Sequence, residues 1–489
     1  MDHLETYFER FRRGIVGLDQ PFVGPYGERK ILYADWIASG RLYEPIEQKM
    51  RYQFGPFIGN THTETSVTGT TMTQSYHQAQ AIIKQHVHAG PDDVLMTTGF
   101  GMTSAVLKLQ RILGLRIPEQ WRACVNIDEK TQPVVFVTHM EHHSNQTTWL
   151  ETLAEVVILQ PDERGLVDLN ELQRQLERYQ DRPTKIGAFT ACSNVTGIQT
   201  PYHQMARLMH QHGGVCFVDF AASAPYVEID MHPPDPLEKL DAIYFSPHKF
   251  LGGPGTSGVL VFDRKLYQLE HPDQPGGGTV DWTNPWGGYK FVDNIEARED
   301  GGTPGFLQAI RASLCLRLKE AMGAANIRAR EEHLVQQAFR ELKTIPGLHL
   351  LAGHIEERLG ILSFYLDRIH YNLMVKLLND RFGIQVRGGC SCAGTYGHFL
   401  LHIDQQRSKK ITDLIDAGDL SAKPGWVRLS LHPTMTDEEL VYVTAAIREI
   451  VKHIDEWERD YVYSASTNEF RHIHFHDNGM NEIRKWFEL

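Results

Sequence analysis

Short apolar runs alternate with helical stretches through the middle of the chain, from about residue 79 to residue 262. The runs predict buried strands, and stretches between them, such as 168–179 and 202–212, predict helices. Strands that alternate with helices predict a mainly parallel sheet covered by helices, so the expected fold class is α/β. The seven predicted strands are residues 94–97, 134–138, 155–159, 186–190, 215–219, 242–246 and 257–262.

Outside this region the pattern changes. Residues 1–30 predict an amphipathic helix, with Leu4, Phe8 and Phe11 on its apolar face, followed by a Gly/Pro-rich connector. Residues 270–305 are rich in Gly, Pro and Trp and predict a long ordered loop.

The last third of the chain predicts a second unit. One long helix is expected over residues 306–343, followed by an α+β pattern from about 344 to 465. We therefore expect a large domain over 31–310 and a smaller domain over 311–489, with residues 1–30 packing against the smaller one.

Composition and charge narrow the possible partners. A chain of 489 residues is long enough for two or three domains. Its 49 basic and 61 acidic residues give a net charge of −12, which argues against a nucleic-acid or anionic-membrane partner. The polar start of the chain is unlike a secretory signal, and six cysteines in so long a chain do not indicate a disulfide framework. The expected location is the cytoplasm.

Lys249 and Asp219 each follow a predicted strand. Asp219 ends the strand 215–219, and Lys249 lies between the strand 242–246 and a glycine-rich turn. Pyridoxal phosphate (PLP) needs an amine for its aldehyde and an anion that keeps its pyridine nitrogen protonated. The pKa of a lysine falls readily on burial, which frees such an amine. A surface lysine and a helix-capping aspartate would explain either residue alone, but the pair favours a PLP site.

Other predicted strand ends carry further polar groups. Ligands of open α/β sheets bind at the carboxyl ends of the strands. The glycine-rich turn 98–104 opens into a helix whose amides could hold a phosphate. His142 follows the strand 134–138. It could stack on a pyridine ring, or it could be one of several solvated histidines in a loop. Asn194 follows the strand 186–190.

This ordered set resembles the PLP-dependent class V aminotransferase superfamily, and within it the cysteine desulfurase and selenocysteine lyase branch. The resemblance runs from about Tyr33 to Val451. It implies PLP fold type I, the aspartate-aminotransferase-like fold, with a large domain built on a mainly parallel seven-stranded sheet and a smaller α+β C-terminal domain.

The resemblance also implies roles for individual residues. Lys249 corresponds to the Schiff-base lysine, and Asp219 to the partner of the pyridine nitrogen. His142 corresponds to the ring-stacking histidine, and Asn194 to the residue at the ring 3′-oxygen. Thr303 corresponds to a threonine that reaches the phosphate of a neighbouring subunit, which implies a homodimer. The implied phosphate ligands are Ser246, His248 and the turn residues Gly99, Phe100, Gly101 and Met102.

Four residues are implied to bind the substrate. Ala38 lies in a motif similar to the N-terminal strand that lines the substrate carboxylate site, and His62 in a segment similar to a further active-site histidine. Arg428, in residues 426–430, resembles the arginine that clamps the substrate carboxylate through two hydrogen bonds. Arg387 lies in the segment 385–394 and is assigned to the same site.

Residues 385–394 resemble a catalytic-cysteine loop. Cys392 lies five residues after Arg387, and a glycine-flanked loop beside an arginine favours a reactive thiolate. Cys390 is the alternative nucleophile; the two cysteines could instead bind a metal, but no second cysteine pair follows them. The remaining cysteines, Cys124, Cys192, Cys216 and Cys315, are predicted to be buried thiols.

The resemblance predicts that L-cysteine or selenocysteine is converted to alanine, with the sulfur passed to Cys392 as a persulfide. A class V aminotransferase, or a β-eliminating carbon–sulfur lyase without a cysteine nucleophile, is the alternative. A non-enzymatic scaffold is disfavoured because the whole ligand set is present. The expected partners are a small amino-acid substrate, a second copy of the chain and a possible sulfur-acceptor protein.

Three features depart from the family pattern or lie outside it. Ala222 stands where the family has a glutamine three residues after the ring aspartate. Residues 396–425 form an apparent insertion between Cys392 and Arg428, either a lid over the site or a surface excursion. The tail 472–476 alternates histidines with apolar residues, which favours an edge strand over a metal site.

Overall fold

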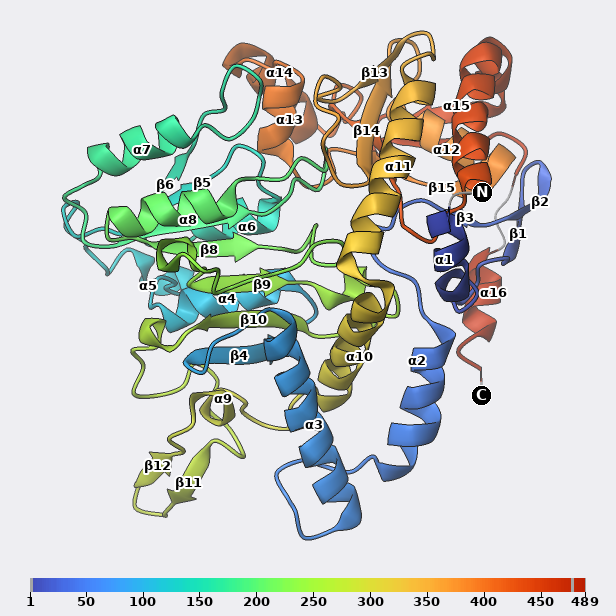
Figure 1. Cartoon of the computed structure of the whole chain (residues 1–489). Helices are drawn as coiled ribbons and strands as arrows, with labels where there is room; N and C mark the ends of the chain where they lie inside the picture. Colours follow the sequence, from blue (N-terminus) through green and yellow to red (C-terminus); the bar gives the residue numbers. More distant parts are fainter. Residues whose placement is uncertain (1–2, 476–478, 489) are drawn as a thin grey trace.

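A twisted seven-stranded sheet forms the centre of the molecule in this computed structural model, which describes residues 3–475 and 479–488 (Figure 1). Its strand order is β4-β10-β9-β8-β7-β5-β6; β10 is antiparallel to both of its neighbours, and the other pairs are parallel. Every predicted strand is present, with boundaries that differ by at most one residue. The strands are β4 (Asp93–Thr98), β5 (Val134–Val137), β6 (Glu155–Ile158), β7 (Lys185–Thr190), β8 (Val215–Asp219), β9 (Ala242–Phe245) and β10 (Gly258–Asp263).

Both faces of this sheet are buried, which explains why its strands are continuous apolar runs. Within β5, Val134 and Phe136 belong to one hydrophobic core, and Val135 and Val137 to the core on the opposite face. Helix α8 (Tyr202–Gln211) packs into the first core, and α4 (Met102–Ile112) into the second. The loops at the carboxyl ends of the strands are left free to carry polar residues.

The long helix predicted over 306–343 is wrong as a single helix. The chain forms α10 (Phe306–Met322) and α11 (Ala324–Leu342), which meet at Gly323. Gly323 has a φ of +78°, a conformation that interrupts a helix and that favours glycine. Helix α10 packs on α3 (Val67–His86), whereas α11 packs on α15 (Asp437–Trp457). We propose Gly323 as the boundary between the two domains. This position lies within the predicted helix, 13 residues after the predicted end of the large domain at residue 310.

The C-terminal unit is built on a four-stranded antiparallel sheet of order β13-β14-β17-β16. Helix α1 (His3–Arg12) lies against α11, and Arg12 forms an ion pair with Glu439 of α15 at 2.7 Å. The strands of this four-stranded sheet are β13 (Leu348–Leu350), β14 (Ile361–Leu366), β16 (Arg387–Gly389) and β17 (Trp426–Ser430), and the helix α12 (Tyr371–Phe382) packs on it.

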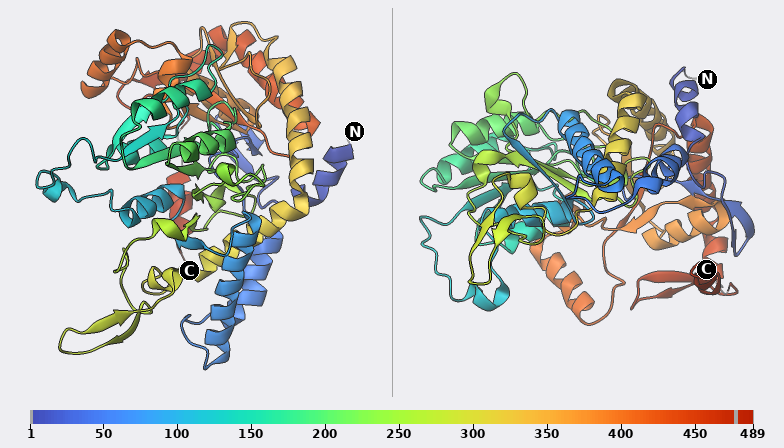
Figure 2. Two further views of the ribbon diagram at one scale, coloured as in Figure 1. Left: turned by 60° about the vertical axis from the view of Figure 1, so that its left-hand side comes forward. Right: turned by 90° about the horizontal axis from the view of Figure 1, so that it is seen from below.

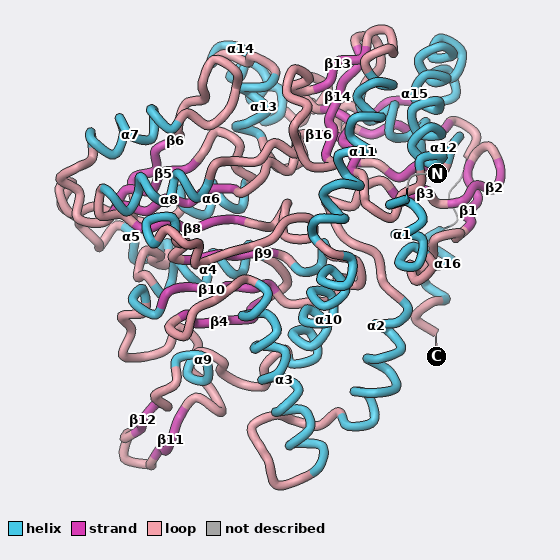
Figure 3. The backbone as a smooth tube through the Cα atoms, in the orientation of Figure 1, coloured by secondary structure: helices cyan, strands magenta, loops and turns pink. Residues whose placement is uncertain are grey.

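Two segments that were expected to be irregular contain regular structure. Residues 270–305 include the hairpin of β11 (Val280–Thr283) and β12 (Tyr289–Phe291), which projects from the body, and α9 (Ile295–Arg298) (Figure 3). The N-terminal connector contains the hairpin of β1 (Pro21–Gly24) and β2 (Gly27–Lys30). Glycine and proline mark the turns here, but they do not exclude short strands between the turns.

The insertion and the tail also contain regular elements. Residues 396–425 contribute to α13 (Gly394–Leu400) and form α14 (Gln405–Asp416), and α14 has no buried residue and projects from the body (Figure 2, right). The tail strand lies earlier than expected: β19 (Glu469–His472) pairs with β18 (Tyr461–Ser464), and His476 lies outside the described residues. Within the described residues, no group of three or more His, Cys, Asp or Glu side chains is placed to hold a metal ion. None of the described helices combines the length and apolar character that a membrane span requires.

Candidate active site

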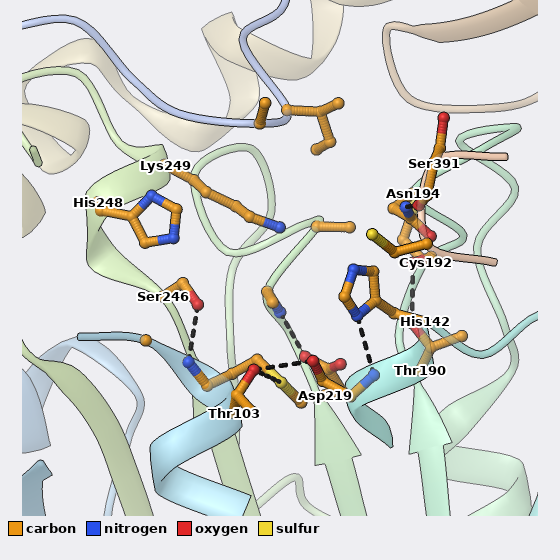
Figure 4. A pocket seen from close by; sticks show the side chains of 18 of the residues that line it. Thr103, His142, Thr190, Cys192, Asn194, Asp219, Ser246, His248, Lys249 and Ser391 are labelled. Atoms are coloured by element: carbon orange, nitrogen blue, oxygen red, sulfur yellow. Dashed lines mark hydrogen bonds between the residues drawn. The ribbon is translucent and has the colours of Figure 1, made fainter. Parts of the chain in front are cut away.

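A cavity of about 380 Å³ opens at the carboxyl ends of the central strands, where they face the C-terminal unit (Figure 4). It brings together most of the residues singled out in the sequence. The lining includes Ala38, Phe100, Gly101, Met102, His142, Asn194, Asp219, Ser246, His248, Lys249, Arg387, Cys392 and Arg428.

Lys249 and Asp219 come from neighbouring strands. Asp219 ends β8, and Lys249 closes the short helical turn Pro247–Lys249 that follows β9. Burial lowers the pKa of Lys249 to about 8, an effect that the charge of Asp219 opposes and those of Arg428 and Arg387 strengthen. Burial raises the pKa of Asp219 to about 6, while a hydrogen bond from the Ala221 N–H and the charge of Lys249 act in the opposite direction. The pair therefore provides an amine that deprotonates readily and a buried carboxylate.

The start of α4 forms one end of the cavity. The Met102 N–H donates a hydrogen bond to Ser246 Oγ at 2.8 Å, so the helix start and the end of β9 are held together. Gly101 permits this approach, because a Cβ atom there would lie 3.0 Å from Ser246 Oγ. Gly99 does not line the cavity; its φ is +52°, a conformation that lets the chain turn from β4 into α4. Backbone amides and hydroxyl groups at a helix start suit a phosphate.

His142 caps α6 (His143–Leu150), and its ring lies opposite Lys249 in the close-up view (Figure 4). Its Nδ1 accepts a hydrogen bond from the Ser144 N–H at 3.1 Å, which leaves the ring proton on Nε2. Burial, together with the positive charge of Lys249, lowers the pKa of His142 to about 3. The ring is therefore a neutral imidazole at physiological pH.

The groups around the cavity fit PLP. Asp219 suits its ring nitrogen, Lys249 its aldehyde, and the start of α4 its phosphate. Asn194 Oδ1 is buried with no hydrogen-bond partner among the described residues, so this amide has unused hydrogen-bonding capacity beside the cavity. Ala222 also lines the cavity and presents only a methyl group, so one ring contact typical of the resembled family is missing here.

Two arginines enter from the C-terminal unit and share one carboxylate. Arg428 of β17 is almost fully buried, and its Nη2 lies 2.9 Å from Asp35 Oδ1. The other oxygen of Asp35 lies 3.0 Å from Nε of Arg387, which begins β16. Burial lowers the pKa of Arg428, while Asp35 raises it. One carboxylate between two guanidinium groups leaves a net positive charge, which suits a substrate carboxylate.

The cysteine loop closes the cavity on the same side. Cys392 is exposed and lines the cavity, whereas Cys390 is half-buried and packs against a hydrophobic cluster. Ser391 and Cys392 have φ values of +53° and +55°, a left-handed conformation that is uncommon outside glycine. The loop is held at Ser391, whose carbonyl accepts a hydrogen bond from Asn194 Nδ2 at 2.7 Å.

His62 and Thr303 do not line this cavity, and they lie near each other elsewhere. Thr303 Oγ1 donates to Asn60 Oδ1 at 3.2 Å, and His62 is exposed beside Gly278. Thr303 lines a second hollow, of about 250 Å³, together with Gly99 and Phe100. The Phe100 side chain is 86% exposed and borders both hollows.

Some site residues were missed by the sequence reasoning. Asp35 lies between Tyr33 and Ala38, in the motif that carried the resemblance, and its negative charge was the available signal. Cys192 was predicted as a buried thiol, which is correct, but it also lines the cavity. Burial raises the pKa of the Cys192 thiol far above its usual range, so it is a poor nucleophile. Cys124 is exposed, so its predicted burial is wrong.

Comparison with known proteins supports the resemblance. The family model for class V aminotransferases matches residues 32–443. A protein named probable cysteine desulfurase from Halalkalibacterium halodurans is 27% identical over 369 residues, 74% of this chain and 84% of that protein. Another so named, from Staphylococcus aureus, is 25% identical over 380 residues, 77% of this chain and 85% of that protein.

Solved structures show the same fold. The apo structure of a cysteine desulfurase from Thermococcus onnurineus aligns with a TM-score of 0.72 at 22% identity, over 91% of this chain and 98% of that chain. A cysteine desulfurase from Escherichia coli aligns with a TM-score of 0.68 at 22% identity and the same coverage. Because the family model spans most of the sequence and the cavity fits the cofactor, the chain belongs to the class V aminotransferase family of PLP-dependent enzymes.

Proposed function

We propose that this protein is a cysteine desulfurase, which converts L-cysteine or selenocysteine to L-alanine and, when cysteine is the substrate, holds the released sulfur on Cys392. The observation that carries the proposal is that an exposed cysteine lines the same cavity as Lys249, Asp219 and Arg428. An aminotransferase has no need of a thiol at that position. The relatives named as cysteine desulfurases support the same reaction.

Arg428 and Arg387 bind and orient the substrate. Arg428 Nε is buried without a hydrogen-bond partner among the described residues, so this guanidinium can still donate to a carboxylate. Asp35 holds both arginines in place, while Ala38 lines the cavity near them. An amino acid bound by its carboxylate here is presented to both Lys249 and Cys392.

Lys249 and His142 provide two sites for protons. With a pKa of about 8, the Lys249 amine can accept and return a proton near neutral pH. His142 is neutral and carries its proton on Nε2, so the neutral imidazole can donate a hydrogen bond or a proton from Nε2. When bound, PLP supplies an electron sink that stabilises negative charge on the substrate carbon.

The Cys392 thiolate takes the sulfur. Its Sγ forms a bond to the substrate sulfur while the bond from that sulfur to the substrate carbon breaks. The electron pair of the broken bond stays on the carbon, which is then protonated to give alanine. The products are alanine and a persulfide on Cys392, from which an acceptor must take the sulfur.

Product analysis tests this proposal against its alternative, an aminotransferase or a β-eliminating lyase. With cysteine as substrate, the desulfurase forms alanine, and Cys392→Ala abolishes that product while Cys390→Ala retains it. An elimination enzyme forms pyruvate, ammonia and sulfide instead, and neither substitution affects it. Alanine formation at the original rate by Cys392→Ala would refute the role of Cys392.

We also propose a homodimer in which Thr303 contributes to the phosphate site of the partner subunit. The support is that Thr303 and His62, both expected at the site, lie together outside the cavity of their own chain. Light scattering should give twice the mass of the chain, and Thr303→Ala should release PLP more readily without unfolding. A monomer with full PLP content would contradict the dimer.

A further inference from the structure

The start of α6 meets the cysteine loop at three successive points. The His143 N–H donates a hydrogen bond to the Cys392 carbonyl at 2.8 Å. The Gly394 N–H donates to Nε2 of the His143 ring at 2.8 Å, and Thr395 Oγ1 donates to Gln146 Oε1 at 2.9 Å. His143 therefore holds the chain at two points directly after the Cys392 side chain, the Cys392 carbonyl and the Gly394 N–H.

The loop needs such support, because Ser391 and Cys392 both have positive φ values. Two consecutive residues other than glycine seldom adopt this conformation without tertiary contacts that hold them. Ser391, which precedes Cys392, is fixed separately. Its carbonyl accepts a hydrogen bond from Asn194, and its Oγ accepts one from Trp426 Nε1 at 3.1 Å. On the far side of Cys392, the bonds from α6 restrain the chain together with the hydrogen bond that the Ala393 N–H donates to the Cys390 carbonyl at 3.0 Å.

The ring of His143 is in the correct form for this contact. Nε2 accepts a hydrogen bond only if it carries no proton, so the ring is neutral with its proton on Nδ1. Burial, reinforced by the positive charge of Lys423, lowers the pKa of His143 and so favours this form. His142, the preceding residue, faces the cavity, so one helix start presents one histidine to the cavity and the other to the cysteine loop.

We propose that His143 is a positioning residue that holds Cys392 in the cavity for sulfur transfer; this inference rests on the proposed desulfurase function. The side-chain bond to Gly394 fixes the loop, and the thiol is thereby presented to the substrate bound at Arg428. His143 itself transfers no proton to the substrate.

The test compares His143→Ala with His143→Gln in the PLP-bound enzyme. The side-chain oxygen of glutamine extends about as far from the backbone as His143 Nε2 and can accept the hydrogen bond from the Gly394 N–H. Alanine removes this acceptor but keeps the backbone hydrogen bond to the Cys392 carbonyl. Leu150→Ala, an exposed position at the other end of α6, is the matched control for a general disturbance of the helix.

Three readouts separate positioning from general damage. For His143→Ala, single-turnover persulfide formation on Cys392 should fall roughly threefold to tenfold, the range expected for one lost hydrogen bond. His143→Gln should restore most of that rate. PLP content and the spectral change on adding cysteine should stay as in the unaltered protein, and Cys392 should be alkylated faster by iodoacetamide in the absence of substrate.

Unchanged persulfide formation and alkylation in His143→Ala would overturn the proposal, and so would an equal loss in His143→Gln. Loss of PLP or of the response to cysteine in His143→Ala would assign the residue to general stability instead and would also overturn it. If Cys392→Ala itself leaves alanine formation intact, the proposed function fails first, so the two failures are distinguishable.

Discussion

The cofactor side and the substrate side of the cavity are positioned in different ways. The cofactor side consists of Lys249, Asp219 and Ser246, which lie at the ends of neighbouring strands of one sheet. The substrate side consists of Arg428 and Cys392, which come from the C-terminal unit and are held by partners far away in the sequence. Arg428, for example, pairs with a carboxylate 393 residues earlier in the chain.

This difference predicts different responses to substitution. On the cofactor side the backbone of the sheet positions each group, so a substitution should remove that group's chemistry and leave the fold intact. On the substrate side the side chains position one another, so loss of one partner should displace the rest. The substitutions below test this contrast.

The largest effect is expected for Lys249→Ala. Removing the amine that binds the cofactor and carries a proton should lower turnover with cysteine at least roughly a hundredfold, within the range for general acid–base catalysis. The visible absorbance of bound PLP should be lost, while the melting temperature of the apoprotein should barely change. Lys249→Arg keeps the positive charge and should be equally inactive; activity in either variant would contradict the role of Lys249.

Asp35→Asn tests the substrate side. Arg428 is almost fully buried, and leaving a buried charge without its partner typically costs about 3–5 kcal/mol. The free energy of unfolding, measured in urea, should fall by about that amount, and KM for cysteine should rise. The matched control is Asp19→Asn, because the Asp19–Lys30 pair is exposed and should contribute at most about 1 kcal/mol. Equal effects of the two substitutions would remove the distinction between the two sides.

The pH dependence of cofactor uptake tests the burial of Lys249 on the cofactor side. The neutral form of Lys249 must react, and its pKa of about 8 means that uptake of PLP by the apoprotein should rise with pH and level off above about 8. At pH 7 uptake should be about tenfold slower than on the plateau. Asp219, with a pKa of about 6, is already ionised there. A rate that still rises at pH 10 would indicate an ordinary exposed lysine.

The smallest effect is expected from shortening α14. No residue of 396–425 lines the cavity, and α14 buries none of its side chains. Replacing residues 405–416 with a short Gly/Ser connector should therefore leave kcat and KM within about twofold, since exposed segments tolerate deletion. A parallel change in kcat and KM with PLP still bound would restore the lid interpretation.

The sequence predicted the cofactor side because short-range patterns specify it. The apolar runs that end in Asp219 or lead to Lys249 identify both the strands and the edge of the sheet where ligands bind. The strand boundaries were accurate for the same reason, since a strand buried on both faces is a continuous apolar run.

The substrate side could be predicted only by resemblance. The pairing of Asp35 with Arg428 depends on how two distant segments pack, and no local pattern encodes it. The break at Gly323 was missed because an isolated glycine is tolerated inside many helices. His143 was visible only as one of several loop histidines until its contact with Gly394 was known.

The proposed reaction depends above all on Cys392 receiving the sulfur of the substrate. The most direct measurement is the mass of the Cys392 peptide after the PLP-bound enzyme is mixed with cysteine in the absence of any sulfur acceptor. We expect a gain of one sulfur atom on Cys392, none on Cys390, and one alanine released for each persulfide formed. An unmodified Cys392 peptide, with pyruvate and ammonia accumulating in solution, would contradict it.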